Sequence, residues 1–254
     1  MSEVKRSTAG HALLGVAGLL CLLAFWWLGI SAFGEAGGLA ERFSPESTFA
    51  SLWELLGRAE LYEHVGVSLK RIFVGLLLAL LIGVPLGLLI GSSRSLEAAT
   101  NPAFQLLRMI SPLSWMPVVV MLMGVGDQPI YFLLTFAAVW PILLNTVAGV
   151  RQLDPRWLQL SRSLSATRWE TLRRIIIPGI LGHVLTGTRL SIGILWIVLV
   201  PCEMLGVSAG LGYFILDTRD RLAYSELMAM VLLIGVLGFM LDAAARGLHR
   251  RWAH

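Results

Sequence analysis

The run from Ile72 to Gly91 contains no charged side chain. A helix needs roughly 20 residues to cross a hydrocarbon core of about 30 Å, and this run is that long. The whole chain is 56% hydrophobic and only 14% charged, with a mean hydropathy of +0.76. A soluble domain carries about 25% charged residues. The sequence therefore predicts an all-α membrane protein, with a single transmembrane domain over residues 1–254.

Uninterrupted apolar length predicts six transmembrane helices. The expected spans are about Ala12–Phe33, Ile72–Gly91, Met109–Gly126, Pro129–Val150, Val184–Cys202 and Leu227–Ala245. Ser111, Pro112 and Ser114 weaken the third span, and Asp242 shortens the last. The first could instead be a signal peptide, because Lys5 and Arg6 precede it, but its apolar run is longer than a typical signal core.

Basic residues predict the orientation, since short loops rich in Lys and Arg stay in the cytoplasm. Most of the 20 basic residues fall in the segments that become cytoplasmic when both termini lie inside. This topology leaves one sizeable external segment at about 34–71 and one cytoplasmic loop at about 151–183. It also accounts for the net charge of +4, so nucleic acid is an unnecessary partner.

Two features outside the loop concern packing. Ser44-Pro45-Glu46 predicts a helix start, and the apolar residues that follow suit either an interfacial helix or a lid over the outer ends of the spans. In the second span Gly83, Gly87 and Gly91 recur every four residues, with Gly75 two turns earlier. This smooth face predicts close helix packing, either within the chain or across a dimer.

The cytoplasmic loop contains two helix starts. Asp154-Pro155 is an N-cap followed by a proline at the first helical position, and Trp157, Leu160 and Leu164 then share one face. Thr167-Arg168-Trp169-Glu170 fits a capping box, which starts a second helix that we expect to end or kink at Pro178-Gly179. The chain must turn between them at Ser165 to Thr167. Taken alone, this basic element could also be an amphipathic linker on the membrane surface.

Several segments together resemble the permease subunits of binding-protein-dependent ABC importers, in the branch that imports nitrate, sulfonates, taurine and bicarbonate. The loop contributes S-R-S-L-S-A-T-R-W, I-I-I-P-G and G-T-R-L-S-I-G, between residues 160 and 193. The other matching segments are Ser68–Gly91, Pro112–Asp127, Trp140–Pro155 and Cys202–Tyr213. They cover most of the chain.

The resemblance implies a type I ABC importer permease architecture of six transmembrane helices with a cytoplasmic coupling helix. It implies docking on ABC ATPase subunits, a second permease copy, membrane lipid, an extracytoplasmic substrate-binding protein, and a location in the bacterial inner membrane. The residues expected to couple to the ATPase are Leu160, Ser161, Leu164, Ser165, Ala166, Thr167 and Glu170. The solute would be a small oxyanion or a related small organic compound.

The loop departs from the family signature at two places. The family has Glu-Ala-Ala where this chain has Gln159-Leu160-Ser161, and a glycine where this chain has Ser165. Serine tolerates a tight turn less well than glycine does. The second departure therefore bears on the docking geometry.

The sequence does not predict an enzyme. Its only lysines are Lys5 and Lys70, and neither follows a P-loop pattern, so ATP and Mg would be bound by the partner ATPase. His183 stands without a catalytic motif, and Cys21 and Cys202 fall inside apolar runs without metal-ligand spacing. We expect no cofactor or metal on this chain. The rival interpretations are an ATP-independent channel and an intramembrane enzyme.

Pathway residues are expected in the third to fifth spans. The candidates are Trp115, Met116, Asn145, Trp196 and Glu203. Glu203 is an acid at the end of an apolar run, which is costly unless it is paired or faces water. We expect it to be a gate or helix-pairing residue rather than a direct ligand, and its partner must come from another helix.

Overall fold

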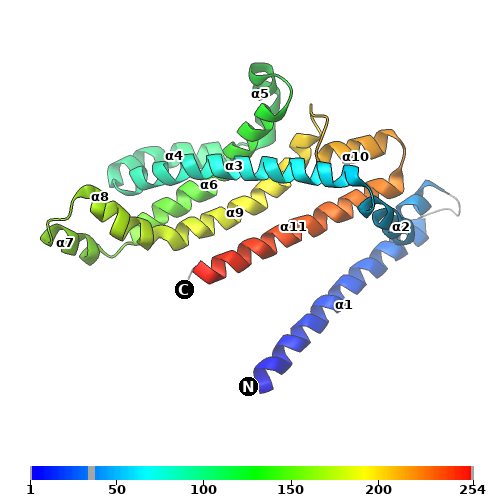
Figure 1. Cartoon of the computed structure of the whole chain (residues 1–254), viewed down its shortest axis with the longest axis horizontal. Helices are drawn as coiled ribbons and strands as arrows, with labels where there is room; N and C mark the ends of the chain where they lie inside the picture. The colour runs from blue at the N-terminus through cyan, green and yellow to red at the C-terminus, as the bar shows by residue number, and fades with distance from the viewer. Residues whose placement is uncertain (1, 34–37, 253–254) are drawn as a thin grey trace. The chain divides into compact units, whose positions relative to one another are not determined.

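The structure is a computed structural model that describes residues 2–33 and 38–252. Within those residues all regular elements are helical, and they group into two compact units. The first unit comprises Met1–Leu61 and Ile215–Leu233, and the second comprises Tyr62–Phe214 and Ile234–His254. Figure 1 shows the elements along the chain.

The first unit contains α1 (Ser2–Phe33), η1 (Leu39–Phe43) and α2 (Pro45–Leu56). Ser44 caps α2 as expected, because its side chain accepts a hydrogen bond from the Ser47 amide. The Trp26 indole donates to the Phe43 carbonyl at 3.1 Å, and the Phe43 ring packs on Tyr224. Arg58 binds the Glu226 carboxylate at 3.1 Å within the same unit.

The second unit is built around α6 (Asp127–Gln152), which packs along most of its length against α9 (Ile177–Glu203). The helix α3 (Ala59–Gly91) also lies on α6, while α4 (Arg94–Met109) turns back beside them (Figure 1). The buried core of the unit includes Leu133, Ile142 and Leu199.

The glycine face of α3 explains this packing. A Cβ added at Gly87 would lie 2.6 Å from Thr146, and one at Gly75 would lie 2.7 Å from Leu134. At Gly91 the nearest atom would belong to Val150. All three neighbours are on α6, so the glycines serve close packing within the chain, one of the two expected roles.

Among the residues that the structure describes, four continuous helices are long and apolar enough to cross a membrane: Ala59–Gly91, Asp127–Gln152, Arg168–Glu203 and Tyr224–Gly247. The apolar part of α1 over Ala17–Ala32 is shorter. These helices match the expected second, fourth, fifth and sixth spans. The helix α11 (Tyr224–Trp252) carries the last of them.

The expected third span is not a single helix. The chain continues helically through Arg108, breaks at Ile110 and Ser111, and resumes as η2 (Pro112–Trp115) and α5 (Met116–Met123). The axes before and after the break differ by 84°, so α4 and α5 make a broken span or a re-entrant loop. Pro112 lacks an amide donor and disfavours a helical residue before it, which favours the break.

The expected end or kink at Pro178-Gly179 takes a different form. The short helix α8 (Arg168–Thr171) passes through a π-helical turn, η3 (Leu172–Ile176), directly into α9 without ending. In this turn the Ile177 amide donates to the Leu172 carbonyl, five residues back. The hydrogen bonds are therefore shifted just before Pro178, which has no amide to donate, and the helix continues past it.

The helix α10 (Leu211–Asp220) was not expected from the sequence.

Candidate functional site

The segment predicted to be the cytoplasmic loop forms two capped helices, as its sequence predicts. In α7 (Pro155–Ser163) the Asp154 carboxylate accepts a hydrogen bond from the Arg156 amide at 2.9 Å. At the other end of α7 the Ala166 amide donates to the Ser161 carbonyl and the Ser165 amide to the Arg162 carbonyl, both at 3.0 Å. These two bonds form a Schellman motif, which closes the helix and sets the direction of the following chain.

Ser165 occupies the left-handed position of this motif, with φ of 56°. Glycine adopts such a φ at little cost, whereas a residue with a Cβ is strained by about 1 kcal/mol. The left-handed backbone at this position therefore explains why the family signature has a glycine here. In this chain serine makes the same turn under strain.

The second helix starts with the predicted capping box. The Glu170 amide donates to the Thr167 hydroxyl at 3.2 Å, and the Thr167 amide donates back to the Glu170 carboxylate at 2.9 Å. Two hydrogen bonds lower the pKa of Glu170 below its usual value. The larger effect comes from the Thr167 amide and the smaller one from the Thr167 hydroxyl. The carboxylate is therefore ionised where the cap needs an acceptor.

A groove of about 820 Å³ lies between α7 and the start of α8. It is lined by six of the seven predicted coupling residues, namely Leu160, Ser161, Leu164, Ser165, Ala166 and Glu170; Thr167 is outside the lining. The structure adds lining residues that sequence reasoning did not single out, among them Gln152, Thr171, Arg174 and Gly179. The hydroxyls of Ser161 and Thr171 lie 2.5 Å apart and tie the two helices together across it.

Several apolar side chains of this segment are exposed in the part of the chain that the structure describes. Leu164 is 72% exposed, and Trp157 and Leu160 are about half exposed. Arg162 and Arg168 are also exposed close by. An apolar strip with basic surroundings is typical of a surface that binds a protein partner.

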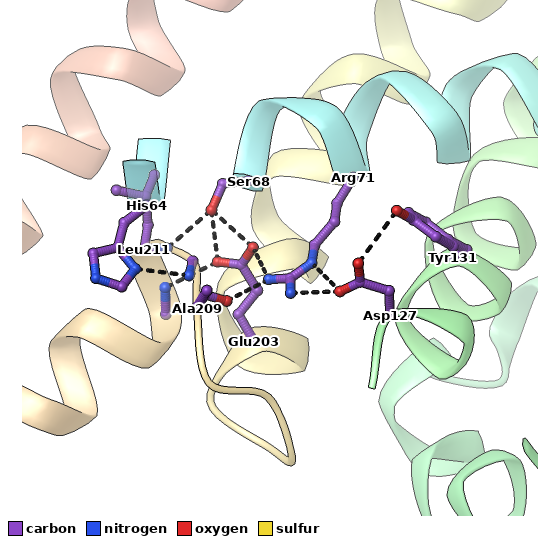
Figure 2. Close-up of polar contacts among 10 residues, drawn as sticks. His64, Ser68, Arg71, Asp127, Tyr131, Glu203, Ala209 and Leu211 are labelled. Atoms are coloured by element: carbon purple, nitrogen blue, oxygen red, sulfur yellow. Dashed lines mark hydrogen bonds and ion pairs between the residues drawn. The ribbon is translucent and has the colours of Figure 1, made fainter. Parts of the chain in front are cut away.

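A second polar site lies at the opposite end of α9, around Glu203 (Figure 2). The Glu203 side chain is fully buried and accepts hydrogen bonds from the Ser68 hydroxyl at 2.7 Å and the Gly212 amide at 3.0 Å. Its charge is neutralised by Arg71 of α3, whose Nη1 lies 2.7 Å from Oε1. The partner that the sequence could not name is therefore Arg71.

Arg71 joins three parts of the chain. Besides Glu203 it binds the Asp127 carboxylate at the start of α6, at 2.6 Å, and the Ala209 carbonyl, also at 2.6 Å. The Gly210 amide donates to Nδ1 of His64 one helical turn before Ser68. A Cβ at Gly210 would collide with Glu203 and Arg71, and its φ of +121° is also unfavourable for other residues. The network thus holds α3, α6 and the 204–210 loop on the end of α9.

Of the other four pathway candidates, Trp115, Met116 and Trp196 belong to the hydrophobic core of the second unit. Met116 is buried in the core, and the half-buried Trp115 packs its ring 5.9 Å from Phe136. The Asn145 amide donates to the Pro141 carbonyl one turn earlier on its own helix. Trp196 lies against Gly238 of α11. Their role in a pathway remains a prediction.

Residues 83–254 match the family of binding-protein-dependent transport system inner membrane components. This match covers more than half of the chain. The chain belongs to this family. Its helical architecture and its several membrane-spanning helices are those of a multi-pass permease.

Named relatives support the same branch that the sequence resembles. The bicarbonate transport system permease protein CmpB of Synechococcus elongatus is 33% identical, with 94% of this chain and 88% of that protein covered. The taurine transport system permease protein TauC of Escherichia coli is 29% identical over the same shares.

Solved structures show the same fold at lower identity. A chain of the inward-facing MetNI methionine ABC transporter matches with a TM-score of 0.63 and 18% identity, covering 76% of this permease and 96% of that chain. A chain of a bacterial alginate ABC transporter, in complex with its alginate-bound periplasmic protein, matches with a TM-score of 0.63 and 15% identity over 96% of both.

Proposed function

We propose that this chain is the permease subunit of an ATP-driven importer that moves a small oxyanion, or a related small organic compound, from a binding protein into the cytoplasm. The observation that carries the proposal is the groove between α7 and α8, with its exposed Leu164 and capped helix ends, in a chain of this family. Such a rigid, apolar, partly basic element is suited to transmit a partner's movement to α9, into which it continues.

ATP is hydrolysed by separate ATPase subunits in this proposal. The coupling residues Leu160, Ser161, Leu164, Ser165, Ala166, Thr167 and Glu170 present or position the docking surface. Closure of the ATPase subunits pushes on this surface, and the continuous helix from α8 to α9 carries the displacement into the membrane. A second copy of the permease completes the pathway, both termini lie in the cytoplasm, and lipid surrounds the pair.

The substrate class comes from the named relatives, whose substrates include bicarbonate and taurine. Nitrate and aliphatic sulfonate permeases are also similar to this chain. These solutes are small and carry an anionic oxygen group. Of the pathway candidates, Glu203 contributes through structure, because its carboxylate is already held by Arg71 and Ser68.

The test is reconstitution of the permease in proteoliposomes with the ATPase and the binding protein encoded beside its gene. We expect ATP hydrolysis to rise when the loaded binding protein is present, together with ATP-dependent uptake. Solute flux without nucleotide would favour a channel, and chemical conversion of a solute by the purified chain would favour an enzyme. Either result, or an ATPase rate that no candidate binding protein changes, would overturn the proposal.

A further inference from the structure

The helix α4 has one polar face. Arg94, Glu97, Asn101, Gln105 and Arg108 follow one another at spacings of three or four residues and therefore lie along one side of the helix. The opposite side carries Ala99 and Leu106. None of the 16 residues of α4 is buried within the described chain, and on the polar face only Glu97 is partly covered.

Two polar contacts are made along this face, one to α6 and one within α4. The Glu97 carboxylate lies 2.6 Å from the guanidinium of Arg151, and the Gln105 amide donates to Asn101 at 3.3 Å. A hollow of about 380 Å³ opens on this face between Arg94, Glu97, Asn101 and Arg151. Within the part of the chain that the structure describes, no carboxylate lies within ion-pair distance of Arg108, and the same holds for Arg94 at the start of the helix.

The packing of the Phe104 ring on Trp140 shows how far along α6 Arg108 lies. The Phe104 ring lies 5.8 Å from the ring of Trp140, which is near the middle of the 26-residue helix α6. Arg108 follows Phe104 by one helical turn, toward the end of α6 that begins at Asp127. It therefore lies level with the middle of α6 rather than with the Gln152 end of that helix. The 84° break comes directly after it.

A charged side chain at this depth is costly in lipid and is found where it faces a partner or a water-filled cavity. We propose that the polar face of α4 lines the water-filled translocation pathway, and that Arg108 is the residue that attracts the anionic group of the solute at mid-membrane. This inference rests on the proposed function, in which a second copy of the chain completes the walls of the pathway. It names a specificity residue in that pathway.

The chemistry of the polar face fits a small oxyanion. The guanidinium offers several N–H donors in a planar fork and keeps its charge at any physiological pH. The neighbouring amides of Asn101 and Gln105 are neutral hydrogen-bonding groups, so a solute leaving Arg108 meets no repelling charge until it reaches the paired Glu97. At the level of Arg108 the face offers one positive charge, which attracts an anion without trapping it.

Cysteine accessibility tests the placement without requiring transport. The complex of permease and ATPase carries Cys21→Ser, because Cys21 is exposed while Cys202 is buried. Arg108→Cys should react with the water-soluble sulfonatoethyl methanethiosulfonate. Leu106→Cys, which is 64% exposed in the single chain but on the other side of α4, should react at least about tenfold more slowly. Equal rates, a faster Leu106→Cys or no reaction at either position would overturn the proposal.

Charge selectivity is tested one turn away, at Gln105→Cys, with Arg108 present or replaced. The measured quantity is the reaction rate with the anionic sulfonatoethyl reagent divided by the rate with the cationic trimethylammonium reagent. This ratio should be about threefold or more higher with Arg108 present than in Arg108→Gln, and Arg108→Lys should keep the higher ratio. An unchanged ratio in Arg108→Gln would refute the anion role. These rates need no binding protein, so they stand even if binding-protein stimulation fails and the importer proposal falls.

Discussion

The Arg71 guanidinium donates to the Glu203 carboxylate at 2.7 Å, and both side chains are almost completely buried. The two residues belong to α3 and α9 and are far apart in the sequence. Since Arg71 also binds Asp127, one cation on α3 holds the start of α6 and the end of α9. A buried cation of this kind is stabilising only while its partners remain in place.

We therefore expect Arg71→Ala to destabilise the permease by about 3–5 kcal/mol, because it leaves two carboxylates without their cation. Glu203→Gln should cost less, since its amide oxygen still accepts from Ser68 and Arg71 keeps Asp127. The loss of folded protein on heating in detergent measures both effects. Arg219→Ala, which removes an exposed pair with Asp220, is the control and should change stability by at most about 1 kcal/mol.

Ser165→Gly should stabilise the turn between α7 and α8 by about 1 kcal/mol, because glycine adopts the observed φ of 56° without strain. Hydrogen exchange at the Ala166 amide, which donates to Ser161, reports the closing of this turn. Ser163→Gly is the control, since residue 163 is helical and glycine should weaken the helix there. Slower exchange in both variants, or in neither, would contradict the strain at Ser165.

Ala166→Glu should uncouple ATP hydrolysis from transport while the chain still folds and inserts. Ala166 is half buried and lines the groove, so a carboxylate there would obstruct docking of the ATPase. Ser163→Glu adds the same charge at an exposed position outside the groove lining and should leave coupling largely intact. Co-purification of the ATPase and uptake per ATP hydrolysed are the measurements. Normal uptake in Ala166→Glu would exclude the groove from coupling.

The capping box should open in acid. The pKa of Glu170 is lowered in the folded chain, so its stabilising effect is present above the unfolded value near 4.5 and is lost as the pH falls through the lower folded value. Hydrogen exchange at the Glu170 amide, corrected for intrinsic rates, should therefore accelerate only below about pH 4.5. In Glu170→Gln the side chain still accepts from Thr167 without titrating, so this acid step should disappear.

Gly87→Ala should destabilise the permease by about 1–3 kcal/mol, because the added methyl would meet Thr146 and the Leu143 carbonyl at distances below 3 Å. Gly66→Ala on the same helix has no atom within 4 Å of the new methyl and should stabilise it by about 0.5–1 kcal/mol. Thermal unfolding of the two variants in detergent compares them directly. Equal shifts would show that the glycine face of α3 does not contact α6 closely.

The two helices between residues 154 and 171 were predictable because their capping signals are short-range. Asp154 and the pair Thr167 and Glu170 cap helices through bonds to amides within three residues, and the structure contains these bonds. The third span was predicted wrongly as one helix. Its apolar composition resembles that of a span, but Pro112 and the residues before it break the helix. A hydropathy pattern does not reveal that the helix axis changes direction at this break.

The sequence alone determined that this is an all-helical membrane protein, because apolar length and local caps depend on neighbouring residues, and the resemblance of its segments indicated the permease family. Only the tertiary structure showed that Arg71 is the partner of Glu203 and that Arg108 lies level with the core of the bundle. Both facts depend on which helices pack together and at what register. Side chains distant in the sequence become neighbours only when the glycine face of α3 and the ring of Phe104 bring their helices onto α6.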